Sequence, residues 1–162
     1  MHLCDIVERL LGFWGHADSV AWPGPGWFSF DAMLPGNPAD SIGHPCYPVD
    51  PLLRYASPEY TARMTHIGRR RGTEADDIFG FGVHAFILLT GRDPFLRGGS
   101  WIEGITTRMT GPYPDIRKEA RKDIPHALID LVANCLTVNP EDRCRSLQGI
   151  RETLRAVHRS LI

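Results

Sequence analysis

The sequence predicts a mainly helical fold, and three observations support this prediction. The segment from Thr73 to Gly91 has a capping residue at one end, a glycine at the other and apolar residues on every side. Two later segments, 124–140 and 146–162, place apolar residues at helical spacing. No stretch of the chain shows the alternation of apolar and polar residues that is typical of a half-buried strand. We therefore expect an all-α core.

The N-terminal third divides into a short helix and an irregular stretch. An amphipathic helix is expected over residues 3–14, with apolar residues at helical spacing. From about residue 19 to 58, closely spaced prolines and glycines exclude long regular elements, although this stretch is rich in aromatic residues. The chain is accordingly expected to comprise an irregular, proline-rich region over 1–54 and a helical region over 55–162.

The segment 73–91 is expected to be the central, buried helix. Thr73 is the expected N-cap, acidic residues follow in the first turn, and Gly91 is a suitable residue to end the helix. A helix that is apolar all round is buried rather than at the surface. Internal glycines such as Gly82 are explained by close packing, and His84 is expected to be a packed core residue rather than a ligand.

Three amphipathic helices are expected after the central one. Ser100 with Glu103 has the pattern of a capping box. The next helix follows the turn "GPYPD", is expected to end at Pro140, and has one face formed by Leu128, Leu131, Val132 and Cys135. In the last helix the inward residues are expected to be Leu147, Ile150, Leu154 and Val157.

The composition excludes several classes of function. The 162 residues suffice for one domain with a core, 43% are hydrophobic and the net charge is −1, so a nucleic-acid-binding surface is not expected. No apolar run reaches the length of a membrane span, and the N-terminus lacks the features of a signal peptide. The four cysteines lack metal-type spacing, so we expect reduced thiols, no metal site and a cytoplasmic protein.

Three motifs, in this order, resemble the C-terminal lobe of a eukaryotic-type protein kinase. "YASPE" (55–59) is similar to the end of the kinase activation segment. "DDIFGFGVHAFILLTGRDPF" (76–95) is similar to the helix that follows it and the turn after that helix. "LVANCLTVNPEDR" (131–143) is similar to a later stretch that ends in an arginine. The resemblance runs from about Tyr55 to the end of the chain, and it implies the helical lobe of the kinase fold without the N-terminal β-rich lobe.

The resemblance assigns roles to residues that support a site. It implies that Glu59 pairs with Arg143, because the planar guanidinium can hold a carboxylate by two parallel hydrogen bonds. It implies that Asp77 anchors the catalytic loop by accepting backbone hydrogen bonds, and Gly82 also matches the family. Tyr55, Ser57 and Pro58 would belong to the activation segment, with Ser57 in place of the alanine of the family.

Most parts that phosphoryl transfer requires are missing from the sequence. There is no glycine-rich phosphate loop of the kinase pattern, and the only two lysines, Lys118 and Lys122, come late. "HAD" (16–18) resembles the catalytic loop, which would make Asp18 the catalytic base, and Asp31 is the candidate for binding the cofactor. A chance match in a proline-rich loop is the alternative interpretation of "HAD".

Three interpretations of the function follow. We favour a protein-kinase-like domain of the Ser/Thr type that does not phosphorylate on its own, needs no cofactor, and binds a protein partner or substrate. The activation segment and the helix at 100–110 would form the binding surface. The alternative is an ATP- and Mg²⁺-dependent Ser/Thr protein kinase whose N-terminal lobe is missing from this chain or supplied by another. The third interpretation is a helical scaffold with coincidental motifs.

Overall fold

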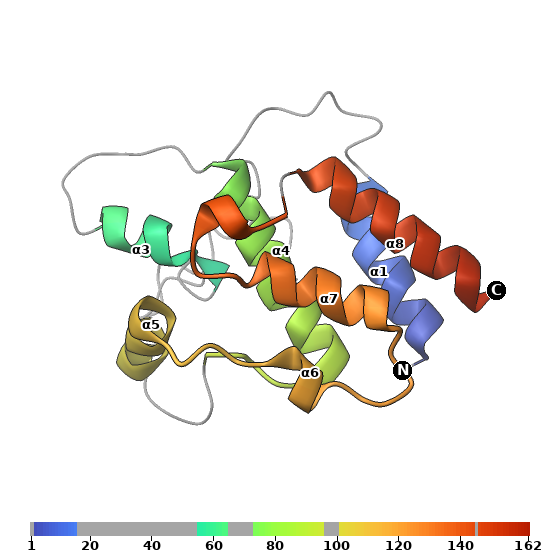
Figure 1. Ribbon diagram of the computed structural model, residues 1–162, viewed down its shortest axis with the longest axis horizontal. Coiled ribbons are helices and arrows are strands. Elements are labelled where there is room, and N and C mark those ends of the chain that lie inside the picture. The colour runs from blue at the N-terminus through green and yellow to red at the C-terminus, as the bar shows by residue number, and fades with distance from the viewer. Residues whose placement is uncertain (1, 16–54, 65–72, 96–100, 145) are drawn as a thin grey trace, which may run out of the picture.

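The computed structural model describes residues 2–15, 55–64, 73–95, 101–144 and 146–162 (Figure 1). These residues are mainly helical and contain no strand, so the prediction of a mainly α fold is confirmed. The elements are α1 (Leu3–Gly15), α3 (Pro58–Met64), α4 (Glu74–Thr90), α5 (Trp101–Thr110), α6 (Ile116–Glu119), α7 (His126–Cys135), the 3₁₀ turn η3 (Pro140–Asp142) and α8 (Leu147–Leu161).

Several sequence predictions lie outside the described residues. They concern the proline-rich stretch up to residue 54 and the cap Ser100. The division of the chain into regions 1–54 and 55–162 therefore stays a prediction.

Helix α4 is the buried centre of the fold, as the sequence predicts. Thr73 caps it through a complete capping box with Asp76, and Gly91 ends it in the left-handed conformation with φ of 72°. Its buried side chains lie on all sides of the helix, and α4 packs against both α7 and α1 (Figure 1). They include Ile78, Phe79, Phe81, Val83, Ala85, Phe86 and Leu89.

The first and last helices pack side by side. Figure 1 shows α1 next to α8 at the end of the molecule where the chain terminates, and the two helices are in contact. The apolar stripe that the sequence predicts for α8 is buried: Leu147, Ile150, Leu154 and Val157. On α1, Ile6, Val7 and Leu10 are buried in the same core. This packing brings the two ends of the described chain together.

The structure corrects the predicted end of the helix over 124–140. Helix α7 ends at Cys135, and Pro140 begins the separate turn η3 instead of ending α7. The side chain of Asn139 caps this turn by accepting a hydrogen bond from the Glu141 N–H. Proline suits the first position of a helical turn because its missing N–H would have no partner there.

A short helix, α6, was also not predicted. Asp115 caps it by accepting a hydrogen bond from the Arg117 N–H, and the chain leaves the helix at Ala120. With four residues, α6 is too short for the apolar periodicity by which helices are found in a sequence. The buried Ile116 attaches it to the core.

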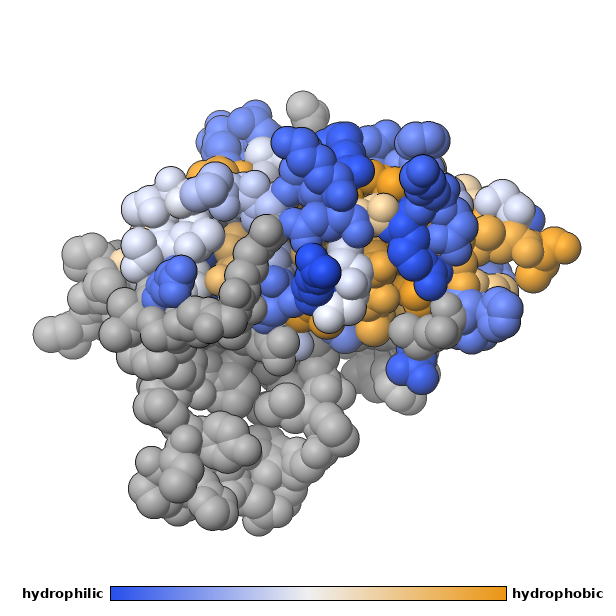
Figure 2. Space-filling view, turned by 90° about the horizontal axis from the view of Figure 1, so that it is seen from below, coloured by the Kyte–Doolittle hydropathy of each residue, from blue (hydrophilic) through white to orange (hydrophobic). Residues whose placement is uncertain are grey.

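Few large apolar side chains are exposed among the described residues. They are Met109 on α5, Val138 before η3 and Ile162 at the C-terminus. In Figure 2, hydrophilic residues cover the middle of the face shown, and hydrophobic residues gather toward one end. Among the described helices, none has both the length and the apolar character that a membrane crossing requires.

We predict that Gly82→Ala lowers the free energy of unfolding. A Cβ at Gly82 would lie 2.8 Å from the Cβ of Cys135 and 3.1 Å from the side chain of Leu136, so α4 and α7 would have to separate. Overpacking of this kind costs about 1–3 kcal/mol, which outweighs a helix-propensity gain of about 1 kcal/mol. A thermal melt should show a midpoint lower by roughly 3 °C.

Gly149→Ala on α8 is the matched control. Its added Cβ would meet only the Ser146 Oγ, at an ordinary 3.4 Å, so the propensity gain should leave the midpoint unchanged or raised. Equal midpoints for the two variants would contradict close packing at Gly82.

Candidate functional site

The segment 55–59 is held against the other helices by its own buried residues. Ser57 and Pro58 are both buried, and Pro58 is the first residue of α3. The Ser57 hydroxyl accepts a hydrogen bond from the Tyr60 N–H at 3.0 Å, which caps the helix. Tyr55 is half-buried, with its ring centroid 6.4 Å from that of His84 on α4.

His84 of α4 faces Tyr55 in this contact. It is half-buried, and burial lowers the pKa of its imidazole below the ordinary value. The neutral ring is therefore the form that packs beside Tyr55 at neutral pH. The sequence predicts a packed core residue at this position, whereas the structure leaves His84 half-buried and outside the buried core.

The structure brings Glu59 and Arg143 together, as the resemblance implies. The residues are 84 positions apart, and the two terminal nitrogens of Arg143 donate to the two carboxylate oxygens of Glu59, Nη2 to Oε2 at 2.8 Å. The side chain of Arg143 is fully buried, whereas that of Glu59 retains 20% exposure. This parallel arrangement is the strong form of a guanidinium–carboxylate pair.

The remaining donors of Arg143 bind backbone oxygens in two other segments. Nε donates to the Thr137 carbonyl at 2.7 Å, Nη2 to the Val138 carbonyl at 3.0 Å and Nη1 to the Ala75 carbonyl at 3.0 Å. Together with the two bonds to Glu59, all five N–H groups of the guanidinium have acceptors. The Arg143 network therefore joins α3, the first turn of α4 and the loop between α7 and η3.

A second link between α3 and α4 was not predicted. The Ser57 hydroxyl also donates to the carboxylate of Asp76, which accepts as well from the N–H and the hydroxyl of Thr73 at 2.7 and 2.8 Å. The sequence carries a partial signal, because Ser57 stands where the family has alanine, directly before a proline that can begin a helix. The partner of Ser57 is 19 positions away and could not be chosen from spacing.

The first turn of α4 also holds the start of α8. The Oε1 of Glu74 accepts a hydrogen bond from the Leu147 N–H at 2.9 Å, and the Ser146 hydroxyl accepts from the Gly149 N–H at 3.1 Å. Two of the N–H groups that a helix start leaves without partners are thereby satisfied. The start of α4 is thus connected to the starts of both α3 and α8.

Asp77, Asp18 and Asp31 remain predictions in their proposed roles. Asp77 is buried in the first turn of α4, with 5% exposure. Asp18 and Asp31, the candidates for catalytic base and cofactor binding, lie outside the described residues. The geometry of a catalytic loop above Asp77 is therefore not part of the described structure.

Aromatic rings continue from the Arg143 network toward α5. The guanidinium carbon of Arg143 lies 4.9 Å from the ring centroid of Phe79, and Phe79 stacks on Phe95 with centroids 5.8 Å apart. Arg108 of α5 covers Phe95 with its guanidinium carbon 4.7 Å from the centroid. Cation–π contacts of buried guanidinium groups are worth more than exposed ones. These contacts attach α5 to α4, the helix to which the Arg143 network also attaches α3.

Burial shifts the pKa of the two polar residues at this stack. Arg108 is 2% exposed, and burial lowers its pKa to about 10, against the opposing effects of Asp93 and Tyr113. Burial raises the pKa of Tyr113 to about 12, and the Tyr113 hydroxyl donates to the carbonyl of Arg108. At neutral pH Arg108 therefore stays charged and Tyr113 stays a donor.

Helices α3 and α5 lie next to each other and form one face. Figure 1 shows both at the end of the molecule opposite the C-terminus, and the two helices are in contact. We call this surface the α3–α5 face and define it by half-buried Tyr60 of α3 and exposed residues of α5. The latter are Glu103, Thr106, Met109 and Thr110.

The thiol that follows Arg143 is also perturbed. A hydrogen bond from Cys135 lowers the pKa of half-buried Cys144 to about 7, and it raises the pKa of buried Cys135 well above the ordinary value. Both cysteines are free.

Comparisons with known proteins identify kinases as relatives. The chain is 33% identical over 105 residues to the peroxide stress-activated histidine kinase mak3 of Schizosaccharomyces pombe, which is 64% of this chain and 4% of that protein. It is 33% identical over 103 residues to the serine/threonine-protein kinase PkaA of Streptomyces coelicolor, 62% of this chain and 17% of that protein. It is 33% identical over 112 residues to serine/threonine-protein kinase A of Synechocystis, 65% of this chain and 19% of that protein.

These matches cover only a small part of each relative. No model of a known protein family matches the chain. The chain spans less than a fifth of the length of these three relatives. The shared stretch establishes a kinase-like region in this chain.

We predict that Glu59→Gln destabilises the fold. The change removes the counter-charge of a fully buried guanidinium, and breaking a buried pair costs about 3–5 kcal/mol. Because the Glu59 side chain keeps 20% exposure, we expect the lower end of this range. A thermal melt should then show a midpoint lower by roughly 5–10 °C.

Asp130→Asn provides the control, because it removes the ion pair with Arg117 in which both side chains are more than half exposed. Exposed pairs contribute less than about 1 kcal/mol. If Glu59→Gln melts no lower than Asp130→Asn, the Arg143 network does not stabilise the fold as argued.

Proposed function

We propose that residues 55–162 form a region like the C-terminal lobe of a Ser/Thr-type protein kinase, and that this region binds proteins without transferring phosphate on its own. The Arg143 network carries the proposal. It fixes the segment 55–59 against α4 and the loop after α7, and the aromatic contacts place α5 beside it. In protein kinases the corresponding surface meets substrates and regulators, so the α3–α5 face is the proposed binding surface.

The lysines of the chain favour a binding module over an enzyme. A kinase needs a lysine that contacts the phosphates of ATP inside a cleft. Lys118 and Lys122 are both exposed, and Lys118 pairs loosely with Asp115 at 3.7 Å on α6. Neither lysine belongs to the surface around Arg143. We accordingly propose a partner that is a protein, with no nucleic acid or membrane involved, and a cytoplasmic location.

The second candidate is an ATP- and Mg²⁺-dependent Ser/Thr kinase whose N-terminal lobe is missing from this chain or supplied by another. One observation favours it: the chain keeps the paired Glu59 and Arg143 and a buried Asp77, the residues that support a catalytic site in the family. The names of the relatives also describe kinases. In this interpretation Asp18 and Asp31 are the proposed base and cofactor-binding residue.

A melt of the purified chain with and without Mg²⁺–ATP distinguishes the two candidates. We expect a cooperative transition with the same midpoint in both conditions. A ligand at about 100 times its Kd would add about 2.7 kcal/mol to the native state, which corresponds to a rise of roughly 5–10 °C. Such a rise, lost in Asp18→Asn or Asp31→Asn, would favour the enzyme and contradict the module.

We predict that Met109→Glu weakens the binding of peptides selected from a displayed peptide library by the wild-type chain. Met109 is an apolar side chain that is 39% exposed on α5, and a carboxylate there would remain unpaired against a bound peptide. Titration should show an affinity that is lower by a factor of up to about ten. Ile162→Glu, at the opposite end of the molecule, is the control and should bind as the wild type does. Equal affinities of both variants would exclude the α3–α5 face as the binding surface.

A further inference from the structure

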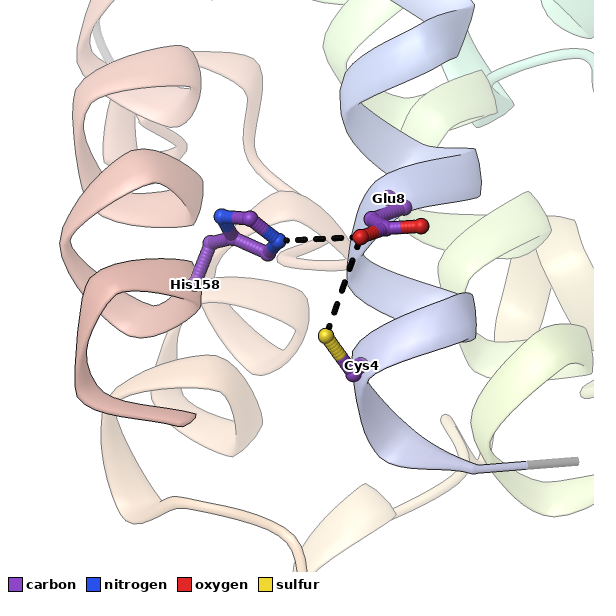
Figure 3. Close-up of side chains that lie close together, drawn as sticks. All are labelled: Cys4, Glu8 and His158. Atoms are coloured by element: carbon purple, nitrogen blue, oxygen red, sulfur yellow. Dashed lines mark hydrogen bonds and ion pairs between the residues drawn. The ribbon is translucent and has the colours of Figure 1, made fainter. Parts of the chain in front are cut away.

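Three side chains with metal-ligating atoms meet where α1 packs on α8. Cys4 and Glu8 lie four residues apart on α1, which places them on one side of that helix. His158 comes from the last turns of α8, 150 positions away from Glu8. Figure 3 shows all three pointing toward one another across the gap between the two helices.

The separations of the three atoms fit a tetrahedral metal ion. The Cys4 Sγ lies 3.8 Å from the Glu8 Oε1, the His158 Nε2 lies 3.3 Å from the same oxygen, and all three atoms lie within 4.8 Å of one another. Zinc–ligand bonds of about 2.0–2.3 Å at tetrahedral angles put sulfur and oxygen about 3.6 Å apart, and nitrogen and oxygen about 3.4 Å apart. Small rotations of the exposed Glu8 and the half-buried Cys4 and His158 side chains would complete the geometry.

We propose that Cys4, Glu8 and His158 form a binding site for Zn²⁺ that joins α1 to α8. A thiolate, an imidazole and a carboxylate are the three ligand types that zinc takes in proteins, and the soft sulfur disfavours Mg²⁺ and Ca²⁺. Glu8 is exposed, with 62% of its side chain accessible, so water can occupy the fourth position. This proposal concerns the packing of the two terminal helices and does not depend on the proposed function.

The helices that carry the ligands are already held in place by apolar packing. On α1 the buried Ile6 and Val7 lie between Cys4 and Glu8 in the sequence, and on α8 Leu154 and Val157 precede His158 and are buried. The backbone at each ligand is therefore fixed before a metal binds, and little ordering remains to oppose binding. The ligand side chains lie outside this core, so replacing them leaves the packing intact.

Coordination changes one bond at each ligand. In the metal-free arrangement the Cys4 thiol donates to Glu8. On binding, the Cys4 S–H bond breaks and its proton leaves to solvent, and His158 gives up the proton on Nε2 that faces Glu8, so that the ring proton is on Nδ1. The sulfur, the Nε2 nitrogen and the carboxylate oxygen then each donate an electron pair to the ion. No oxidation or reduction takes place.

Titration of the purified, reduced chain with Co²⁺, followed by displacement with Zn²⁺, tests the site. Thiolate-bound Co²⁺ absorbs in a sulfur-to-cobalt charge-transfer band, which reports the cysteine itself rather than a change in stability. We expect this band in the wild-type chain, its loss when Zn²⁺ is added, and its absence in Cys4→Ser. In His158→Asn we expect Zn²⁺ affinity to fall by about tenfold or more, because altering even the groups around metal ligands costs 10–100-fold.

Two controls test one other thiol and one other histidine among the described residues. Cys144→Ser removes a half-buried thiol and His126→Gln removes an exposed histidine of α7, and neither should change the band or the affinity. Melts in the presence of a chelator should show that Cys4→Ser and His158→Asn fold as the wild type does. Should either fail to fold, Glu8→Gln replaces it, and we expect it to lower the affinity while keeping the band.

A wild-type chain without the charge-transfer band overturns the proposal. So does a Cys4→Ser variant that keeps the band, because the thiolate would then come from another cysteine. A third contrary outcome is Zn²⁺ affinity unchanged in both His158→Asn and Glu8→Gln.

Discussion

The fold depends on one buried guanidinium. The side chain of Arg143 is fully buried, and a charge removed from water destabilises a protein unless its hydrogen bonds are all made. Here five acceptors from three segments surround it, two from Glu59 and three from backbone carbonyls. Since the desolvation cost is offset only when all of these segments are in place, the network couples the position of α3 to that of α4 and of the loop after α7. Phe79, below the guanidinium, extends this coupling to Phe95 and α5.

The first turn of α4 links this network to the starts of two other helices. Helix N-termini have N–H groups without partners and a partial positive charge, so carboxylates are stabilising there. Asp76 and Glu74 in this first turn also accept hydrogen bonds from the starts of α3 and α8. Asp76 thus completes the cap of α4 and binds the start of α3, and Glu74 binds the start of α8. The N-terminus of α4 thus positions the helices that support the α3–α5 face.

Local features of the sequence predicted the central parts of the fold. The limits of α4 followed from Thr73 and Gly91, because caps act within a few residues of the backbone they satisfy. The inward stripe of α8 followed from periodicity. The end of α7 did not, because Pro140 can either stop a helix or begin a turn, and the choice depends on the capping by Asn139.

Contacts between distant residues were predictable only where a resemblance paired them. The sequence alone offers no reason to select Arg143 for Glu59 over any other arginine, and the kinase motifs supplied that choice. Nothing supplied a partner for Ser57, Arg108 or His158. The Cys4, Glu8 and His158 group arises from the packing of the first helix on the last, which depends on apolar surface that carries no information about the ligands themselves.

The proposed binding surface and the proposed metal site lie in different parts of the structure. The α3–α5 face and the α1–α8 contact lie at opposite ends of the described structure (Figure 1), and both rest on α4, which packs against α1 and, through the Arg143 network, holds α3. The side chains of Cys4, Glu8 and His158 are not among the buried core residues, so their coordination requires no repacking of that core. A metal ion between α1 and α8 would therefore stabilise the helical base while leaving the geometry around Arg143 unchanged. Binding at the α3–α5 face would depend on zinc only under conditions in which the base itself begins to unfold.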